Sequence, residues 1–146
     1  MKLCIASDHR GYKLKEQLIE YLNNKYDIED LGTNSIESVD YTKYAFLLGE
    51  KIKRKECDFG IAICGTGIGI SIACNKVKGV RCAKVDSVED AKLTRNDNDS
   101  NIIAFSGAIE LSKAIEYVET FLNTPFSKEE KHIRRVNDII NYERGI

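Results

Sequence analysis

Cys64 is the side chain of this sequence best suited to chemistry. It closes the apolar run Phe59–Ile63, and glycines follow it at alternate positions: Gly65, Gly67 and Gly69. A thiol beside a cation or a helix amino terminus can exist as a thiolate near neutral pH, and a thiolate can act as a base. Glycines let successive backbone N–H groups converge on one point, as in anion-binding loops. The segment therefore joins a candidate base to a candidate anion site.

The glycine pattern admits three interpretations. As a dinucleotide-binding fingerprint it follows a strand, opens a helix and has Asp86 at the end of the next strand, but its GxGxG spacing departs from that motif. The glycines could instead only allow a helix to pack closely on a strand. The third interpretation is general base catalysis on a sugar phosphate, with backbone amides stabilising an enediolate. The hydroxyl groups of Thr66 and Ser71, which a structural turn would not need, favour the third.

The composition predicts a single domain, residues 1–146. Hydrophobic residues make up 42% of the chain, and 146 residues are too few for two ordinary domains. A formal net charge of -1 gives no global attraction toward nucleic acid or anionic membrane. No apolar run approaches the length of about 20 residues that spans a bilayer. We therefore expect a soluble, cytoplasmic protein that binds neither nucleic acid nor membrane.

The cysteines predict neither a disulfide framework nor a zinc site. The chain has five, Cys4, Cys57, Cys64, Cys74 and Cys82, and no two of them form a CxxC pair. An odd count suits neither a closed set of disulfides nor a zinc knuckle. We expect reduced thiols and no bound metal, with Cys4 and Cys82 as small core residues.

Strand-like and helix-like segments alternate along the chain. Five runs have the composition of strands: Lys2–Ser7, Asp27–Leu31, Asp58–Cys64, Val80–Val85 and Asn101–Phe105. Five helices are predicted between and after them: Tyr12–Tyr26, Tyr44–Ile52, Ile68–Lys76, Ser87–Arg95 and Ala108–Leu122. This order predicts an α/β fold, a five-stranded parallel sheet in a three-layer αβα sandwich of the Rossmann or flavodoxin type.

An extra helix is predicted after Pro125. Ser127 and Glu130 have the spacing of a capping box, and an apolar stripe follows them. No strand follows this helix, so we expect it to pack on a partner subunit.

The ends of two strands predict where a ligand binds. Open α/β sheets bind ligands beyond the carboxyl ends of their strands, at the point where the strand order reverses. The first strand runs into Asp8 and His9, and the third ends at Cys64. In the flavodoxin-like order 2-1-3-4-5 these two strands are neighbours. We therefore expect the three side chains to share one crevice.

Four segments carry a resemblance to a known family. They are Ser7–Lys15 (SDHRGYKLK), Asp30–Thr33 (DLGT), Val39–Ala45 (VDYTKYA) and, most specific, Ile63–Arg81 (ICGTGIGISIACNKVKGVR). Nearly from end to end, the chain resembles the type B ribose-5-phosphate isomerases, which also include the subunits of galactose-6-phosphate isomerase. The resemblance implies reversible aldose–ketose isomerisation through an enediolate, without a metal or organic cofactor. It also implies homodimers, or tetramers built from them, with active sites that draw on both subunits.

The resemblance implies a role for each matching residue. Cys64 would be the base that moves a proton between C1 and C2 of the sugar. Asp8 and His9 would contact sugar hydroxyls or the ring oxygen, and Asn98 would bind substrate from the partner subunit. The residues implied to hold the enediolate oxygens, or to support those that do, are Gly65, Thr66, Gly67, Ile68, Gly69 and Ser71.

The phosphate clamp that the resemblance implies lies on the last helix, at Lys131 and Arg135. Residues four apart share one helix face, where like charges repel by about 0.2 to 0.5 kcal/mol, and an anion would relieve that repulsion. A solvated basic face is the alternative that the residues alone favour. Because lysine lacks the bidentate fork of arginine, we expect the contact of Lys131 with phosphate to differ from that of an arginine.

Two positions depart from the family's pattern. Asp97 stands where the family usually has a histidine that is thought to open the furanose ring, and an ordinary carboxylate is ionised at neutral pH and has no proton to give. A protonated Asp97, His9, or the use of open-chain substrate could each replace that histidine, and we favour His9. Ala108 stands where the family commonly has a phosphate-binding arginine.

These observations predict an isomerase that interconverts ribose 5-phosphate and ribulose 5-phosphate in the pentose phosphate pathway. The first alternative is a six-carbon substrate, galactose or allose 6-phosphate, handled in a mixed oligomer whose other chain supplies the missing histidine and arginine. The second is a non-catalytic module that binds sugar phosphates.

Overall fold

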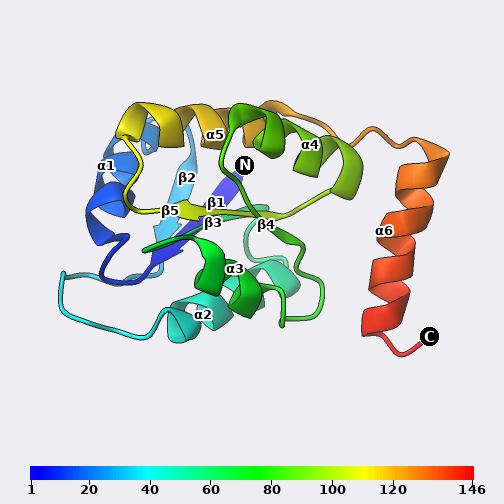
Figure 1. The fold of residues 1–146 in the computed structure, drawn as a ribbon, viewed down its shortest axis with the longest axis horizontal. Helices are drawn as coiled ribbons and strands as arrows, with labels where there is room; N and C mark the ends of the chain where they lie inside the picture. Colours follow the sequence, from blue (N-terminus) through cyan, green and yellow to red (C-terminus); the bar gives the residue numbers. More distant parts are fainter.

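Five parallel strands form the centre of the protein, in a computed structural model that describes residues 1–146. The strands are β1 (Lys2–Ser7), β2 (Asp27–Asp30), β3 (Phe59–Cys64), β4 (Cys82–Lys84) and β5 (Ile102–Ser106). Each corresponds to a predicted strand, with small shifts at the ends. Figure 1 shows them as one sheet between two groups of helices, so the predicted three-layer sandwich is confirmed.

The order of the strands differs from the expected one at one edge. The observed order is β2-β1-β3-β5-β4, so β5 rather than β4 lies beside β3. The burial of the two strands explains the exchange: Ile102–Phe105 is fully buried, whereas Cys82–Lys84 is only half-buried and includes a lysine. A strand with a charged residue suits a sheet edge. β1 and β3 are neighbours as predicted, with Ser7 paired to Ile63.

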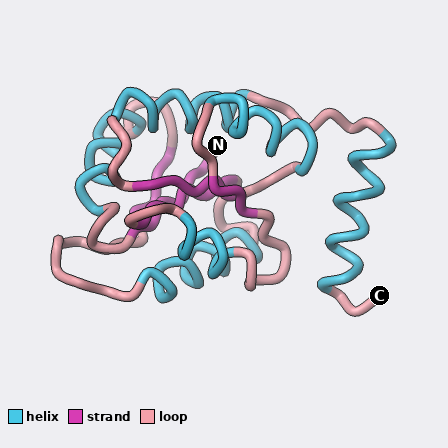
Figure 2. Tube along the Cα trace, viewed as in Figure 1, coloured by secondary structure: helices cyan, strands magenta, loops and turns pink.

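The helices cover the sheet unequally. They are α1 (Tyr12–Leu22), α2 (Tyr41–Lys53), α3 (Ile68–Cys74), α4 (Val88–Asn98), α5 (Leu111–Asn123) and α6 (Glu130–Glu143). α1, α4 and α5 lie on one face, and α2 and α3 lie on the other, as the tube in Figure 2 also shows. The helices predicted before residue 125 are therefore all present, with shifted ends.

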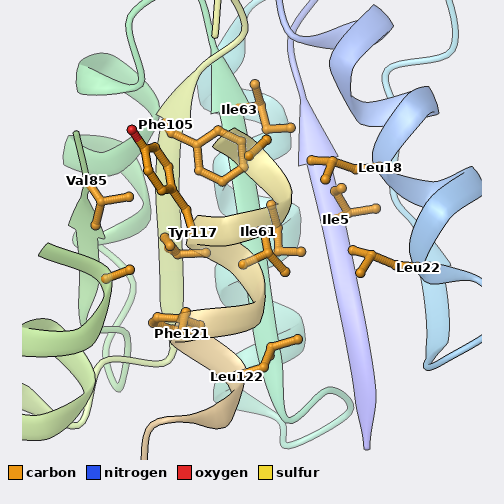
Figure 3. Packing of buried hydrophobic residues seen from close by; sticks show 14 of the residues in the cluster. Ile5, Leu18, Leu22, Ile61, Ile63, Val85, Phe105, Tyr117, Phe121 and Leu122 are labelled. Atoms are coloured by element: carbon orange, nitrogen blue, oxygen red, sulfur yellow. The ribbon is translucent and has the colours of Figure 1, made fainter. Parts of the chain in front are cut away.

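The two faces of the sheet carry side chains of different size. Alternate residues of a strand point to opposite faces. On the α1/α5 face β1 and β3 place Ile5, Ile61 and Ile63, which pack with Phe121 and other residues of those helices (Figure 3). On the α2/α3 face the same strands place Cys4, Ala6, Ala62 and Cys64. Cys64 therefore belongs to the face with small side chains.

α6 stands apart from the sandwich (Figure 1). It packs against α4 and buries only His132 and Val136. The predicted capping box is wrong, because the residue that caps the helix is Glu129 and no side chain makes a capping hydrogen bond. Ser127 instead accepts a hydrogen bond from Glu129 N–H and shares one with His132 Nδ1 at 2.6 Å. The hydroxyl that would cap the helix is therefore already occupied.

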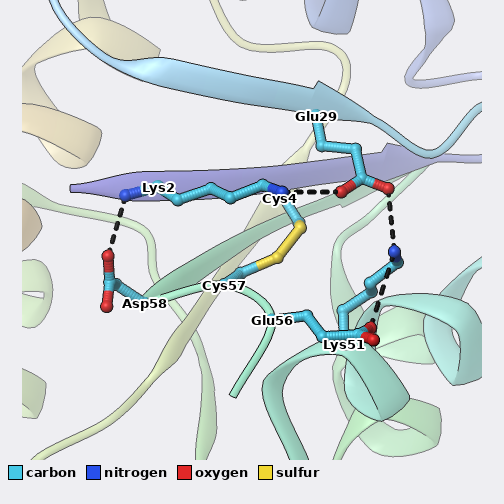
Figure 4. The surroundings of a disulfide bond; sticks show 7 residues. All are labelled: Lys2, Cys4, Glu29, Lys51, Glu56, Cys57 and Asp58. Atoms are coloured by element: carbon cyan, nitrogen blue, oxygen red, sulfur yellow. Dashed lines mark hydrogen bonds and ion pairs between the residues drawn. A yellow bond between two sulfur atoms is a disulfide. The ribbon is translucent and has the colours of Figure 1, made fainter. Parts of the chain in front are cut away.

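The expectation of five reduced thiols is wrong for two cysteines. Cys4 and Cys57 form a disulfide, with their Cα atoms 6.0 Å apart, that joins β1 to the residue before the turn into β3. Figure 4 shows the ion pairs around it, in which Glu29 contacts Lys2 and Lys51. The other three cysteines are free. A hydrogen bond with Cys74 and burial raise the pKa of the Cys82 thiol well above its usual value.

None of the helices has the length and apolar character that crossing a bilayer requires. No group of three or more histidine, cysteine or acidic side chains is arranged to hold a metal ion.

Candidate active site

Three loops meet at the carboxyl ends of β1, β3 and β5. The backbone N–H of Asp8, directly after β1, donates to the carbonyl oxygen of Ile63 at 3.1 Å. The N–H of Gly107, directly after β5, donates to the carbonyl oxygen of Cys64 at 2.8 Å. Ser106 Oγ donates to the next carbonyl oxygen of the glycine loop at 2.7 Å. These bonds hold the loops around Cys64 in one arrangement.

Cys64 is only 4% exposed, and its sulfur faces the glycine loop. The N–H of Gly67 donates to Sγ at 3.1 Å. Gly67 has a φ of +80° and lies so close to β5 that an added Cβ would meet the backbone carbon of Phe105 at 2.7 Å. Only glycine combines that conformation with that approach. The sharp turn at Gly67 thus directs a hydrogen-bond donor at the sulfur. A donor at this position stabilises the negative charge of a thiolate, the form that can act as a base.

Two N–H groups of the loop, those of Gly67 and Ile68, donate within the chain, and others are free. The N–H of Ile68 donates to Thr66 Oγ1 at 3.1 Å, and Ser71 Oγ donates to the Ile68 carbonyl at 3.0 Å. The N–H groups of Gly65, Thr66 and Gly69 donate no hydrogen bond within the chain. Because the Thr66 oxygen accepts its bond, the hydroxyl proton stays available to a ligand. The loop therefore offers free donors beside the sulfur, although fewer than glycine spacing alone indicates.

Asp8 and His9 lie on the loop after β1. Asp8 is 5% exposed, and its Oδ1 accepts hydrogen bonds from the N–H groups of Arg10 at 2.9 Å and Gly11 at 3.1 Å, which fixes the entrance to α1. His9 Nδ1 accepts a hydrogen bond from Val39 N–H at 3.2 Å. A neutral imidazole whose Nδ1 accepts must carry its proton on Nε2. His9 can therefore donate from Nε2.

Within the same chain, Asp97 and Asn98 lie near the amino-terminal ends of the strands, opposite the end that carries Cys64. α4 runs antiparallel to the strands, so its last turn ends near their amino termini. Asp97 Oδ1 accepts from Asn96 Nδ2 at 2.7 Å and lies 3.7 Å from His132 Nε2. The carbonyl oxygen of Asn98 accepts from Arg81 Nε at 3.0 Å. A single chain therefore does not bring Asp97 or Asn98 to Cys64.

Lys131 and Arg135 are both exposed on α6. The same helix carries His132, which lies next to Asp97, so α6 also lies away from Cys64. Lys131 Nζ lies 3.8 Å from a carboxylate oxygen of Glu129, an exposed pair. A cavity of about 370 Å³, lined by Asn98, Arg81 and residues of β4 and α6, also lies at this end of the sheet rather than beside Cys64. The predicted site residues thus fall into two groups, one around the glycine loop and one around the end of α4 and α6.

Arg10 also lies beside the glycine loop, although the sequence did not predict it there. Its guanidinium lies on the backbone of Gly65, so close that a Cβ on Gly65 would be 2.7 Å from Nη1 and 2.8 Å from Cζ. In the sequence, the one sign of a role for Arg10 was its position next to His9, just after the carboxyl end of a strand where a ligand was expected to bind.

The fold and the site define the class of protein: an α/β enzyme with a thiol, free amide donors, an acid and a histidine at one end of a parallel sheet. Residues 3–139 match the model of the Ribose/Galactose Isomerase family, and the chain belongs to that family. It is an isomerase of the ribose-5-phosphate isomerase B type.

Full-length relatives support this assignment. Ribose-5-phosphate isomerase B of Mycolicibacterium paratuberculosis is 35% identical, with 99% of this chain and 92% of the relative covered. The Clostridium thermocellum ribose-5-phosphate isomerase B structure superposes with a TM-score of 0.95 at 41% identity, covering 99% of both chains. The Mycoplasma genitalium ribose-5-phosphate isomerase B structure with bound ribulose 5-phosphate has a TM-score of 0.93 at 40% identity, covering 99% of this chain and 97% of the other.

Proposed function

We propose that this isomerase interconverts ribose 5-phosphate and ribulose 5-phosphate, with Cys64 as the base. The observation that carries the proposal is the hydrogen bond from Gly67 N–H to Cys64 Sγ, at the mouth of a loop with free amide donors. The choice of substrate is supported by the Mycoplasma genitalium enzyme, whose structure contains ribulose 5-phosphate.

The proposed reaction moves one proton between neighbouring carbons. The Cys64 thiolate takes the proton from C2 of the open-chain aldose, and the electron pair of that bond forms the enediolate, with the negative charge on the oxygen of C1. The free N–H groups of Gly65 and Thr66 and the Thr66 hydroxyl stabilise that charge, each such donor contributing about 3 to 4 kcal/mol. The thiol then returns the proton to C1, and the proton of the C2 hydroxyl passes to the oxygen of C1, which leaves the ketose.

His9 is the residue we favour for opening the furanose ring. With Nδ1 accepting from Val39, the Nε2 proton is available to the ring oxygen. Asp97, the other candidate, is engaged by Asn96 and lies near His132 at the far edge of its own chain. Asp97 could reach Cys64 only from a second copy, together with Asn98, and an ordinary carboxylate there has no proton to give at neutral pH, whereas His9 follows β1 in the chain that carries the base.

A homodimer would unite the two groups of site residues. Large apolar side chains are exposed on α2 and α3 beside the loop: Phe46 is 45%, Leu47 44% and Ile72 56% exposed. A second copy on this face would cover them, and its Asn98, Lys131 and Arg135 could then complete the site around Cys64. The proposed dimer thus accounts for both the uncovered apolar surface and the divided site.

Replacing Cys64 tests the proposal. We expect Cys64→Ala to lower the turnover of ribose 5-phosphate by at least about 100-fold, since a general base typically contributes that much or more. The melting temperature should stay near that of the unaltered protein, because the substitution removes a single atom. Cys82→Ala, which removes a thiol from β4, serves as the control and should keep full turnover. Undiminished turnover in Cys64→Ala would rule out the assignment of the base.

A six-carbon substrate is the second candidate. The family that matches residues 3–139 is described as ribose and galactose isomerases, which keeps galactose 6-phosphate in consideration. A panel of pentose and hexose phosphates, followed for ketose formation with the pure protein, separates the two. Conversion of ribose 5-phosphate by this chain alone would also remove the need for a different partner chain.

A further inference from the structure

The Arg10 guanidinium lies flat on the glycine loop. A Cβ built on Gly65 would lie 2.7 Å from Nη1, 2.8 Å from Cζ and 2.9 Å from Nε of Arg10. Three nearly equal distances mean that the face of the guanidinium, not its edge, covers Gly65. The N–H bonds lie in the plane of the group, so they point along the surface of the loop and away from Gly65.

The charge of Arg10 has no partner in the protein. Its guanidinium takes part in none of the ion pairs and donates no hydrogen bond. Arg10 is exposed, so its donors face solvent, whereas the half-buried Arg81 and the buried Arg95 both pair with Asp99. A guanidinium that lies on the loop with all its donors free can bind an oxyanion bidentately.

The backbone of Arg10 is held in place from two sides. Its N–H donates to Asp8 Oδ1 at 2.9 Å. On the other side, a Cβ on Gly107 would meet the Arg10 carbonyl oxygen at 2.4 Å, so the loop after β5 lies directly against it. That loop, Ser106–Ala108, brings no cation of its own. Arg10 therefore places a positive charge on Gly65, the residue after Cys64.

We propose that Arg10 binds the phosphate group of the sugar phosphate, as a substrate-specificity residue. This inference rests on the proposed function. Lys131 and Arg135 lie at the far edge of the same chain, so Arg10 supplies the contact to phosphate from the subunit that carries the base, and α6 of a second copy supplies the others.

Steady-state kinetics with two substrates test the assignment. For Arg10→Ala we expect the KM for ribose 5-phosphate to rise about 10- to 100-fold, the range for losing hydrogen bonds to a charged group, with kcat within about threefold. Turnover of unphosphorylated ribose should be unchanged. Arg10→Lys should recover part of the KM, because lysine keeps the charge and loses the bidentate geometry. If Arg10 instead stabilised the enediolate, kcat would fall for both sugars, which would overturn the proposal.

A binding measurement separates this inference from the proposed function. Inorganic phosphate titrated into the full-length protein should bind at least about tenfold more weakly to Arg10→Ala than to the unaltered protein. Arg54→Ala removes the same charge at the far end of α2, where Arg54 pairs with Glu50, and should leave phosphate binding unchanged. Weakened phosphate binding without any turnover of pentose phosphate would reject the proposed function and keep the role of Arg10. If Arg10→Ala instead showed normal turnover, an unchanged KM and an unchanged affinity for phosphate, the role of Arg10 would be rejected and the proposed function would stand.

Discussion

At the scale of single residues, Gly67 and Cys64 act as one unit. The left-handed conformation of Gly67 aims its N–H at the sulfur, and the backbone of Phe105 fills the space that a side chain would need. The position of the base and the shape of the loop therefore depend on the same missing Cβ.

Replacement of two left-handed glycines separates conformational strain from steric clash. Gly79 has a φ of +90°, and an added Cβ there meets nothing within 4 Å, so Gly79→Ala should cost only the left-handed strain of about 1 to 2 kcal/mol. Gly67→Ala adds the clash with Phe105 and should lower the free energy of unfolding by clearly more, with loss of turnover. Urea denaturation measures both, and equal losses would show that the loop yields to the added methyl group.

The sequence predicted Cys64, the loop and the neighbouring Asp8 and His9 because each stands at the end of an apolar strand. It did not predict which amides are free. The Thr66 hydroxyl oxygen accepts a hydrogen bond from Ile68 N–H, so that N–H is not free for a ligand. No sequence pattern shows when a hydroxyl group will bond to a nearby backbone N–H in this way. Arg10 was missed for a related reason, since an exposed arginine after a strand is common and only its position on Gly65 marks it.

At the scale of secondary-structure elements, Lys15 joins α1 to the end of β2. Its side chain is fully buried, and Nζ contacts both Asp30 oxygens, at 2.8 and 2.9 Å, and Glu16 Oε1 at 2.9 Å. Asp30 also accepts from Gly32 N–H at 2.9 Å, which shapes the turn after β2. One carboxylate therefore neutralises a buried ammonium and fixes a loop at the carboxyl edge of the sheet.

Truncating the two acidic partners of Lys15 should have unequal effects. Asp30→Ala leaves the buried ammonium largely uncompensated and should lower the free energy of unfolding by about 2 to 3 kcal/mol, somewhat less than a fully buried pair because Asp30 is partly exposed. Glu16→Ala removes a half-exposed carboxylate and should cost less than about 1 kcal/mol. Chemical denaturation of both variants checks this, and a larger effect at Glu16 would contradict it.

Element identity was readable from the sequence, and element placement was only partly so. Apolar runs and helical spacing predicted all five strands and the helices between them. The exchange of β4 and β5 was not predicted, although the charged residues Arg81 and Lys84 in the run Val80–Val85 were a signal for an edge strand that the run Asn101–Phe105 lacks. The capping box of α6 failed because His132, five residues away, shares the Ser127 hydroxyl.

At the scale of the whole molecule, the divided site makes a prediction about mixed dimers. Cys64→Ala and Arg135→Ala chains should each have little activity. If each site takes its base from one chain and α6 from the other, random association makes half of the dimers mixed, each with one intact site, so co-refolded chains should regain about a quarter of the full activity. An assay before and after mixing measures the gain. Activity no higher than that of the separate chains would show that the site does not cross between subunits.

The unequal faces of the sheet bear on how an enzyme of this kind can evolve. Isoleucine, leucine and phenylalanine on the α1/α5 face form a tightly packed core in which changes of volume are costly (Figure 3). The α2/α3 face, lined by alanines and Cys64, carries the catalytic loop and the surface proposed for a second subunit. The two faces therefore constrain the sequence for different reasons. Packing volume constrains the α1/α5 face, whereas the catalytic loop constrains the α2/α3 face, where the segment Ile63–Arg81 carries the most specific resemblance to the family.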